Sequence, residues 1–153
     1  MSQERTEMTS QVDALALNLT RVSGAFSRLA GRAPGNGYSL IAWRVIAELD
    51  GGGPARVSEL AQQHRIAQPS MTGLVQRLEG EGWLTRSPDP ADGRATLVSV
   101  TDAGRAALGR FRAAAAARIS PQLARLSDFD RATLARAVEL MQQLVDGVDD
   151  PSG

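Results

Sequence analysis

The sequence lacks cysteine and lysine, and it contains a single histidine and few aromatic residues. Without cysteine there is no disulfide framework, no thiolate metal site and no thiol redox switch. One histidine alone argues against structural zinc, so we expect neither a metal nor a cofactor. No apolar run approaches the roughly 18 residues of a membrane-spanning helix, and the N-terminus has no signal-peptide pattern. We therefore expect a cytoplasmic protein without a membrane partner.

Neither sign of charge is in excess, because the sequence has 17 basic and 17 acidic residues. A zero net charge argues against strong non-specific attraction to nucleic acid, although the distribution of charge matters more than its sum. Arginine is the only charged residue type in 104–127, whereas acids dominate 128–150. The absence of lysine is more typical of a genome-wide codon bias than of a site. The length of 153 residues favours one domain with its own core.

Catalytic groupings are missing as well. The sequence has no paired carboxylates, no metal-binding cluster and no nucleophile beside a base. Ser70 lacks the glycines of a nucleophile elbow. The glycine run at 51–53 is not followed by the Gly-Lys-Ser/Thr of a phosphate-binding loop, so we interpret it as a turn. We expect that the protein is not an enzyme.

Two long amphipathic helices are present near the ends of the chain. Apolar residues recur at spacings of three and four from Val12 to Leu29 and again from Leu134 to Val148. The segment GRAPGNG at 31–37 ends the first helix. We expect disorder only in about the first ten and the last five residues.

A further helix precedes the last one. Thr101 and Asp102 are typical of its start, and Pro121 is expected to kink or interrupt it. Ser127 with Asp130 three residues later predicts where the last helix begins.

Three shorter helices and a hairpin are predicted between these long helices. The first short helix covers 38–49 and ends at the glycines that follow it. Ser58 is expected to cap the second, and Gln68 with Pro69 opens the third. After Gly82, the runs WLTRS and ATLVSV are prone to form strands, and PDPADGR joins them.

The third short helix has two different faces. Met71, Leu74, Val75 and Leu78 form an apolar face. The opposite face carries small and polar residues: Gln68, Pro69, Ser70, Thr72, Gly73, Gln76 and Arg77. Gly73 costs about 1 kcal/mol of helix stability relative to alanine, and close approach to a partner would compensate for it. The alternative is a solvated polar face.

This order of elements is typical of a winged helix-turn-helix, whose third helix lies in the DNA major groove. The segments SELAQQHRIAQPSMTGLVQRLEGEGWLTR and DPADGRATLVSVTDAG resemble the multiple-antibiotic-resistance regulators, the MarR family. The resemblance extends from Leu40 to about Val148, with Asp92, Arg94, Thr101 and Gly104 at the expected places.

The resemblance implies a mainly α fold with a small β-hairpin wing, and one domain over residues 1–153. Dimerisation helices would cover about 11–33 and 103–148, and a DNA-binding lobe about 38–101. The implied function is a sequence-specific DNA-binding transcriptional regulator, with repression as the expected mode. It would bind double-stranded DNA as a homodimer on a pseudo-palindromic operator and respond to a small-molecule effector through unassigned residues.

We expect the exposed face of the third helix to meet bases and adjacent phosphates, and Arg77 and Arg86 to hold backbone phosphates. The resemblance implies roles for two further residues. Arg94, expected at the hairpin tip, would enter the minor groove, where negative potential favours arginine. Asp92 would steady that arginine.

Four alternatives remain open at this point. A winged-helix protein-interaction module without DNA binding would also fit the zero net charge. The long helices could pack within a monomer. Tyr38 and Trp43 could be core aromatics or walls of an effector pocket, and His64 could lie at the core edge or contact phosphate.

Overall fold

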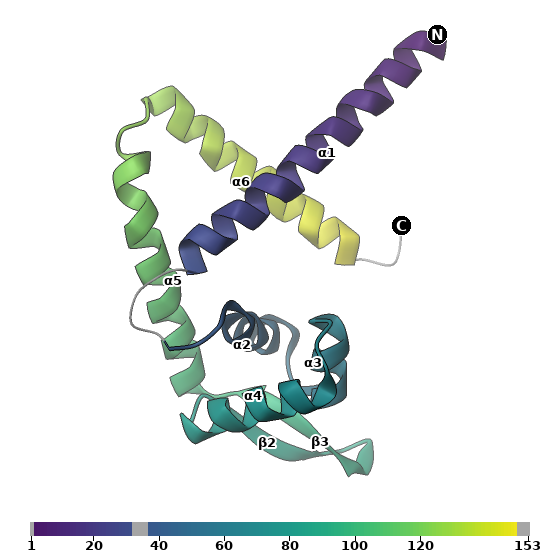
Figure 1. The fold of residues 1–153 in the computed structure, drawn as a ribbon, viewed down its shortest axis with the longest axis vertical. Helices are drawn as coiled ribbons and strands as arrows, with labels where there is room; N and C mark the ends of the chain where they lie inside the picture. The colour runs from purple at the N-terminus through teal and green to yellow at the C-terminus, as the bar shows by residue number, and fades with distance from the viewer. Residues whose placement is uncertain (1, 32–36, 150–153) are drawn as a thin grey trace. The chain divides into compact units, whose positions relative to one another are not determined.

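The computed structural model describes residues 2–31 and 37–149 of the chain. Its residues up to 116 form one compact unit and those from 117 a second (Figure 1). Nine elements follow in order: α1 (Ser2–Gly31), α2 (Leu40–Gly52), β1 (Ala55–Arg56), α3 (Val57–Gln63), α4 (Gln68–Gly80), β2 (Leu84–Asp89), β3 (Asp92–Val100), α5 (Asp102–Leu123) and α6 (Asp128–Asp149). The expected mainly α fold with a small β wing is confirmed.

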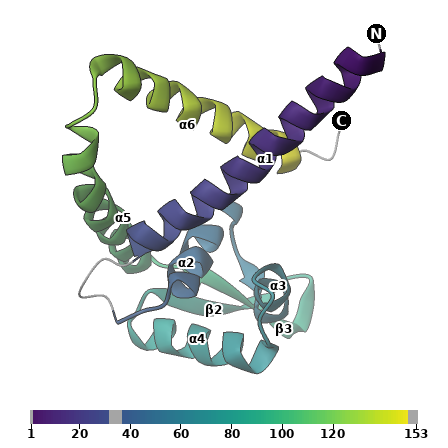
Figure 2. The same cartoon turned by 45° about the horizontal axis from the view of Figure 1, so that its top comes forward.

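The core lies in the winged-helix lobe, which we define as residues 38–101 together with the first turns of α5. Helix α2 is central to it, because its apolar residues are buried along most of its length. Helices α3 and α4 pack together, and each turns an apolar face to this core. Figure 2 shows α2, α3 and α4 around the strands. The fully buried side chains include Val45, Ile46, Leu60, Met71, Val75, Leu78 and Val98.

The wing is an antiparallel sheet with the strand order β1-β3-β2. Leu84 pairs with Val100 at its base, and the hairpin turn is Pro90–Ala91. The two-stranded hairpin was expected, but strand β1 was not. It has two residues, too few for a period-2 pattern to appear in the sequence.

The start of α5 rests on the loop that joins α4 to β2. The Thr101 hydroxyl donates to the Gly82 carbonyl at 2.6 Å and accepts the Gly104 N–H at 3.1 Å, which caps the helix. A Cβ on Gly104 would lie 2.2 Å from the Trp83 carbonyl oxygen. Thr101 and Gly104 therefore have structural roles in seating α5 on the lobe.

Four predicted boundaries were wrong. The first short helix was expected over 38–49 and the glycine run as a turn, but α2 covers Leu40–Gly52, so Gly51 and Gly52 are helical. Residue Ser58 lies inside α3, whose cap is Arg56, because the Glu59 carboxylate accepts the Arg56 backbone N–H at 2.8 Å. Helix α1 begins at Ser2, since the polar residues we expected to be disordered include good helix formers such as Gln, Glu, Arg and Met. Helix α5 continues through Pro121 to Leu123, so the expected interruption at this proline was wrong. Only the bond that its N–H would donate to the Ala117 carbonyl is lost.

Helices α1 and α6 keep much of their apolar surface open. The exposed large apolar residues include Val12, Leu15, Val22, Phe26 and Leu29 on α1, and Leu134, Val138, Met141, Leu144 and Val145 on α6. Ser127 caps α6 as predicted, because its hydroxyl accepts the Asp130 N–H at 3.1 Å. No helix in the described ranges is both long and apolar enough to cross a membrane.

Candidate nucleic-acid interface

The two faces of α4 are arranged as the sequence predicted. Met71, Leu74, Val75 and Leu78 are buried. The opposite residues stay at the surface, with Thr72 half-buried and the others exposed: Gln68, Pro69, Ser70, Gly73, Gln76 and Arg77. The lobe therefore presents a polar helix face to solvent, and the contact of these residues with DNA stays a prediction.

The chemistry of this face is set by short side chains and amides. The Thr72 hydroxyl donates to the Gln68 carbonyl at 2.9 Å and leaves its oxygen lone pairs on the surface. A Cβ on Gly73 would meet nothing within 4 Å. The fold thus places no steric demand for glycine at this position, and the missing side chain only makes the surface lower. A low face with amides and hydroxyls suits base edges and phosphates.

Arg77 lies near the C-terminal end of the same face. Its guanidinium carbon is 5.7 Å from the centre of the Tyr38 ring. The pKa of Tyr38 is raised, mainly because its hydroxyl hydrogen-bonds to the Glu81 carboxylate. Arg77 remains exposed, so the ring orients its cation without removing it from solvent.

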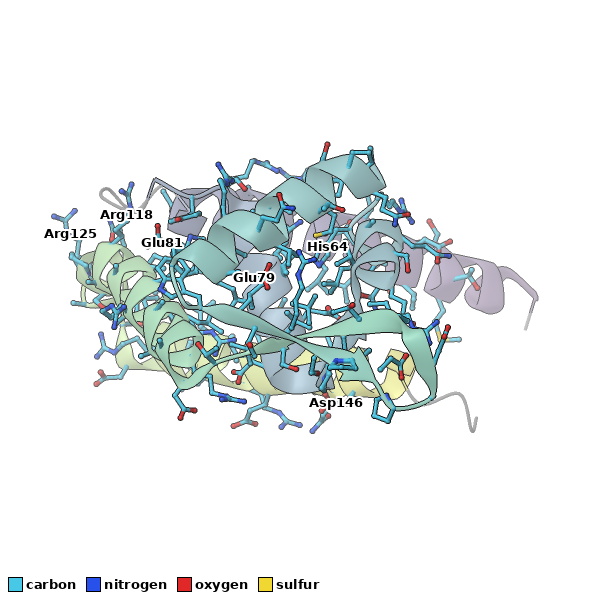
Figure 3. The ribbon with its side chains drawn as sticks, turned by 90° about the horizontal axis from the view of Figure 1, so that it is seen from below. His64, Glu79, Glu81, Arg118, Arg125 and Asp146 are labelled. Atoms are coloured by element: carbon cyan, nitrogen blue, oxygen red, sulfur yellow. The ribbon has the colours of Figure 1, made fainter. Side chains whose placement is uncertain are left out.

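Arg86 on β2 is joined to α4 by an ion pair. Its Nε lies 2.9 Å from the Glu79 carboxylate, and about a third of its side chain is exposed. Figure 3 shows Glu79 between α4 and the hairpin. The phosphate contact of Arg86 stays a prediction, and the pair fixes the hairpin relative to α4.

Arg94 does not lie at the hairpin tip, so that expectation was wrong. The turn is Pro90–Ala91, and Arg94 is the third residue of β3. The reason is local: the Asp89 carboxylate accepts the Ala91 N–H at 2.9 Å and closes a tight turn before Asp92. The Arg94 side chain is outside the described part of the chain, so its minor-groove role stays a prediction.

The base of the wing is held by an arginine that sequence reasoning missed. Arg56 Nε donates to the Asp89 carboxylate at 2.9 Å, and its guanidinium lies 3.9 Å from the Asp92 carboxylate. The hydrogen bond from Arg56 lowers the pKa of Asp89 and raises the pKa of Arg56. The Asp89 side chain is only 8% exposed. Asp92 therefore has a partner in Arg56, and its predicted role beside Arg94 stays a prediction.

Four of the six aromatic residues, Tyr38, Trp43, Trp83 and Phe111, form one cluster in the lobe and the start of α5. Trp43 stacks on Phe111 with 4.7 Å between ring centres, and Trp83 lies 5.3 Å from Trp43 and 5.0 Å from Tyr38. Trp43 and Tyr38 are thus packed with the core, as one of the two sequence interpretations expected.

His64 ends α3 and is half-buried (Figure 3). Its Nε2 is buried and makes no hydrogen bond within the described residues. These residues also hold no group of three or more His, Cys, Asp or Glu side chains that could bind a metal. His64 therefore occupies the core edge.

A hollow of about 240 Å³ lies beside the aromatic cluster. Its walls combine apolar side chains with two arginines: Ser27, Leu40, Trp43, Arg44, Ala47, Leu108, Phe111 and Arg112. The Trp43 indole N–H is buried without a hydrogen-bond partner among the described residues.

The comparisons with known proteins agree with this architecture. A model of the MarR family matches residues 39–96, the segment from α2 into the wing. An uncharacterized HTH-type transcriptional regulator of Mycobacterium bovis is 33% identical over 132 residues, which is 86% of this chain and 90% of that protein.

Solved structures share the fold. A transcriptional regulator from Thermotoga maritima has a TM-score of 0.72 at 22% identity, with 88% of this chain and 95% of that one covered. A MarR mutant from E. coli complexed with operator DNA has a TM-score of 0.55 at 20% identity, with 86% and 95% covered. With its winged-helix lobe, the matching family model and a relative of this identity and coverage, the chain belongs to the MarR family of transcriptional regulators.

Proposed function

We propose that this regulator binds double-stranded DNA with α4 in the major groove and the wing along the backbone. The observation that carries the proposal is the exposed face of α4, which is low, polar and open at Gly73 while its opposite face is fully packed. A family structure holds operator DNA. Such a protein would act in the cytoplasm, where a bacterial chromosome lies, and repression of transcription is the mode we propose.

The acting form in this proposal is a homodimer. Helices α1 and α6 each leave a row of large apolar side chains open to solvent. Contiguous apolar surface of this kind marks a protein interface in a soluble protein. A dimer with two-fold symmetry would bind a pseudo-palindromic operator whose half-sites are about 34 Å apart, one turn of DNA.

The hollow beside Trp43 supports a small-molecule effector. Its apolar walls and its two arginines, Arg44 and Arg112, suit a ligand with an apolar body and an acidic group. Effector binding can change DNA affinity only if the ligand prefers one arrangement of the two lobes. Titration of benzoate into the protein by calorimetry tests this point, and Arg112→Ala should weaken any binding observed.

The DNA-binding proposal is tested by the affinity of the dimer for DNA as a function of salt. Duplexes selected from a randomised library provide the probe, and anisotropy of a dye-labelled duplex provides the affinity. Log affinity should fall steeply with log salt, because neutralising phosphates releases counterions. If selection enriches no sequence and the protein shows no salt-dependent binding to any duplex, the alternative of a protein-interaction module without DNA binding is favoured.

Arg94 gives a residue-level test of the wing. Arg94→Ala should weaken binding by roughly 1 to 3 kcal/mol and reduce the salt slope by about one per subunit. Arg94→Lys should restore only part of the affinity, because an ammonium is more strongly hydrated than a guanidinium. Equal binding by Arg94→Ala at every salt concentration would show that this strand does not touch DNA.

A further inference from the structure

The turn between α3 and α4 contains an arginine in an unusual backbone conformation. Arg65 has a φ of 53°, and within the described residues it is the only non-glycine residue with positive φ. Left-handed backbone is unfavourable for residues with a Cβ and is typical of glycine. The residue that would suit this backbone best is therefore not the one that is present.

Among the residues that the structure describes, no hydrogen bond or ion pair of the fold uses the Arg65 side chain. The turn is closed by backbone hydrogen bonds, from Arg65 N–H to the Gln62 carbonyl at 3.1 Å and from Ile66 N–H to the Ala61 carbonyl at 3.0 Å. Glycine would make both equally well. The side chain is exposed, and its guanidinium has no ion pair or hydrogen bond with any residue that the structure describes.

The position of Arg65 places its guanidinium, which has no ion pair with the described residues, beside the polar face of α4. It precedes α4 by three residues, whereas Arg77 lies near the opposite end of that helix. Helix α4 has 13 residues and is about 20 Å long, while the major groove is about 12 Å wide. The two ends of a helix seated in the groove therefore reach the phosphate backbones of opposite strands.

We infer that Arg65 is a phosphate-binding residue that anchors the N-terminal end of α4 on one DNA strand. The nearby arginines of the lobe are already engaged, Arg56 with Asp89 and Arg86 with Glu79. The positive end of the α4 dipole adds to the attraction for an anion at this end of the helix. This inference rests on the proposed DNA-binding function and adds a contact that the α4 face and the wing do not supply.

The test compares three substitutions at this one position. Arg65→Gly and Arg65→Ala should both weaken binding on the order of tenfold and reduce the salt slope by about one per subunit. Arg65→Lys should keep most of the slope. Arg65→Gly should also raise the melting temperature above that of Arg65→Ala by about 2 to 4 °C, because glycine removes the backbone strain.

The probe is a selected duplex of about 30 base pairs, which holds two half-sites one helical turn apart. Arg125→Ala, which removes an exposed arginine from the segment between α5 and α6, serves as the matched control and should leave the slope unchanged. If Arg65→Gly binds like the parent at every salt concentration, or if Arg65→Lys loses as much as Arg65→Ala, the inference is overturned while the DNA-binding function stands. If the parent chain binds no duplex, that function fails and the inference fails with it.

Discussion

Apolar residues recur at the same helical spacing in the winged-helix lobe and in the terminal helices. They are buried in the lobe and exposed on the terminal helices. In α4 the apolar residues at this spacing are buried in the core, and Leu78 is 0% exposed. In α1 and α6 the same spacing leaves Phe26 52% and Val138 66% exposed. The lobe has three helices and a sheet that close on one another, whereas each long helix offers a face without a partner in its own unit. A row of apolar residues at helical spacing thus predicts a helix with a face that must be buried. It does not predict whether the same unit or a partner buries that face.

The largest effect is expected from breaking the open face of α6. The double change Val138→Asp with Val145→Asp puts two charges on the exposed stripe and should reduce the mass in light scattering from twice 16.2 kDa. DNA affinity should fall by roughly 100-fold or more, because two linked sites become two separate ones.

The control for that variant keeps the charge and changes the face. Ala132 and Gln143 are exposed and lie opposite the stripe, at about 100° per residue. Ala132→Asp with Gln143→Asp should remain a dimer. If the variant with both Val138→Asp and Val145→Asp keeps twice the monomer mass, this face of α6 needs no second copy to cover it. The contrast with the buried apolar residues of the lobe would then fail.

The next largest effect concerns how the lobe closes on itself. Gly104→Ala should lower the free energy of unfolding by about 3 kcal/mol, at the upper end of overpacking costs, because its Cβ would collide with the Trp83 carbonyl. Gly109→Ala on the same helix meets nothing within 4 Å and should raise stability by up to about 1 kcal/mol. Urea unfolding followed by circular dichroism measures both, and equal changes would contradict the tight seat of α5.

A smaller effect, with a defined pH dependence, is expected at the base of the wing. Arg56 lowers the pKa of Asp89 below its ordinary 3.8, so the contribution of this carboxylate to stability is present above that pH and lost as the pH falls through the folded value. Arg56 stays charged throughout, since its own pKa is raised.

Asp89→Asn should therefore be less stable than the parent at neutral pH, by less than Gly104→Ala. The difference in melting temperature should hold down to about pH 5 and shrink below pH 4. A difference that stays constant through pH 3 would mean that the ion pair does not contribute.

A small change in stability is expected at Gly73, and this variant separates the role of the residue in the fold from its role on the surface. Gly73→Ala should stabilise the protein by about 1 kcal/mol, because alanine favours the helix and its Cβ has room. The same methyl should weaken DNA binding if α4 sits close to base edges. A variant that is more stable and binds DNA as tightly as the parent would favour a solvated polar face.

Some local features were predictable from the sequence, and the long-range ones were not. The two faces of α4 followed from a period of 3.6, and the caps at Thr101 and Ser127 followed from residues within three positions. The pair between Arg56 and Asp89 joins residues 33 positions apart, and no local pattern marks it. The hairpin turn was misplaced for a different reason. The bond from the Ala91 N–H to the Asp89 carboxylate is local, but the run PDPADGR does not show which of its residues will close the turn.

The aromatic cluster gives the molecule a built-in optical label. Its two tryptophans, Trp43 and Trp83, lie in the lobe with 5.3 Å between ring centres, and the chain has no others. Intrinsic tryptophan fluorescence therefore comes from the lobe alone, because α1 and α6 contain no tryptophan. Far-ultraviolet dichroism, by contrast, is dominated by the long helices. The interval between the two unfolding curves would measure directly how strongly the folding of the DNA-reading lobe is coupled to that of the helices at the ends of the chain.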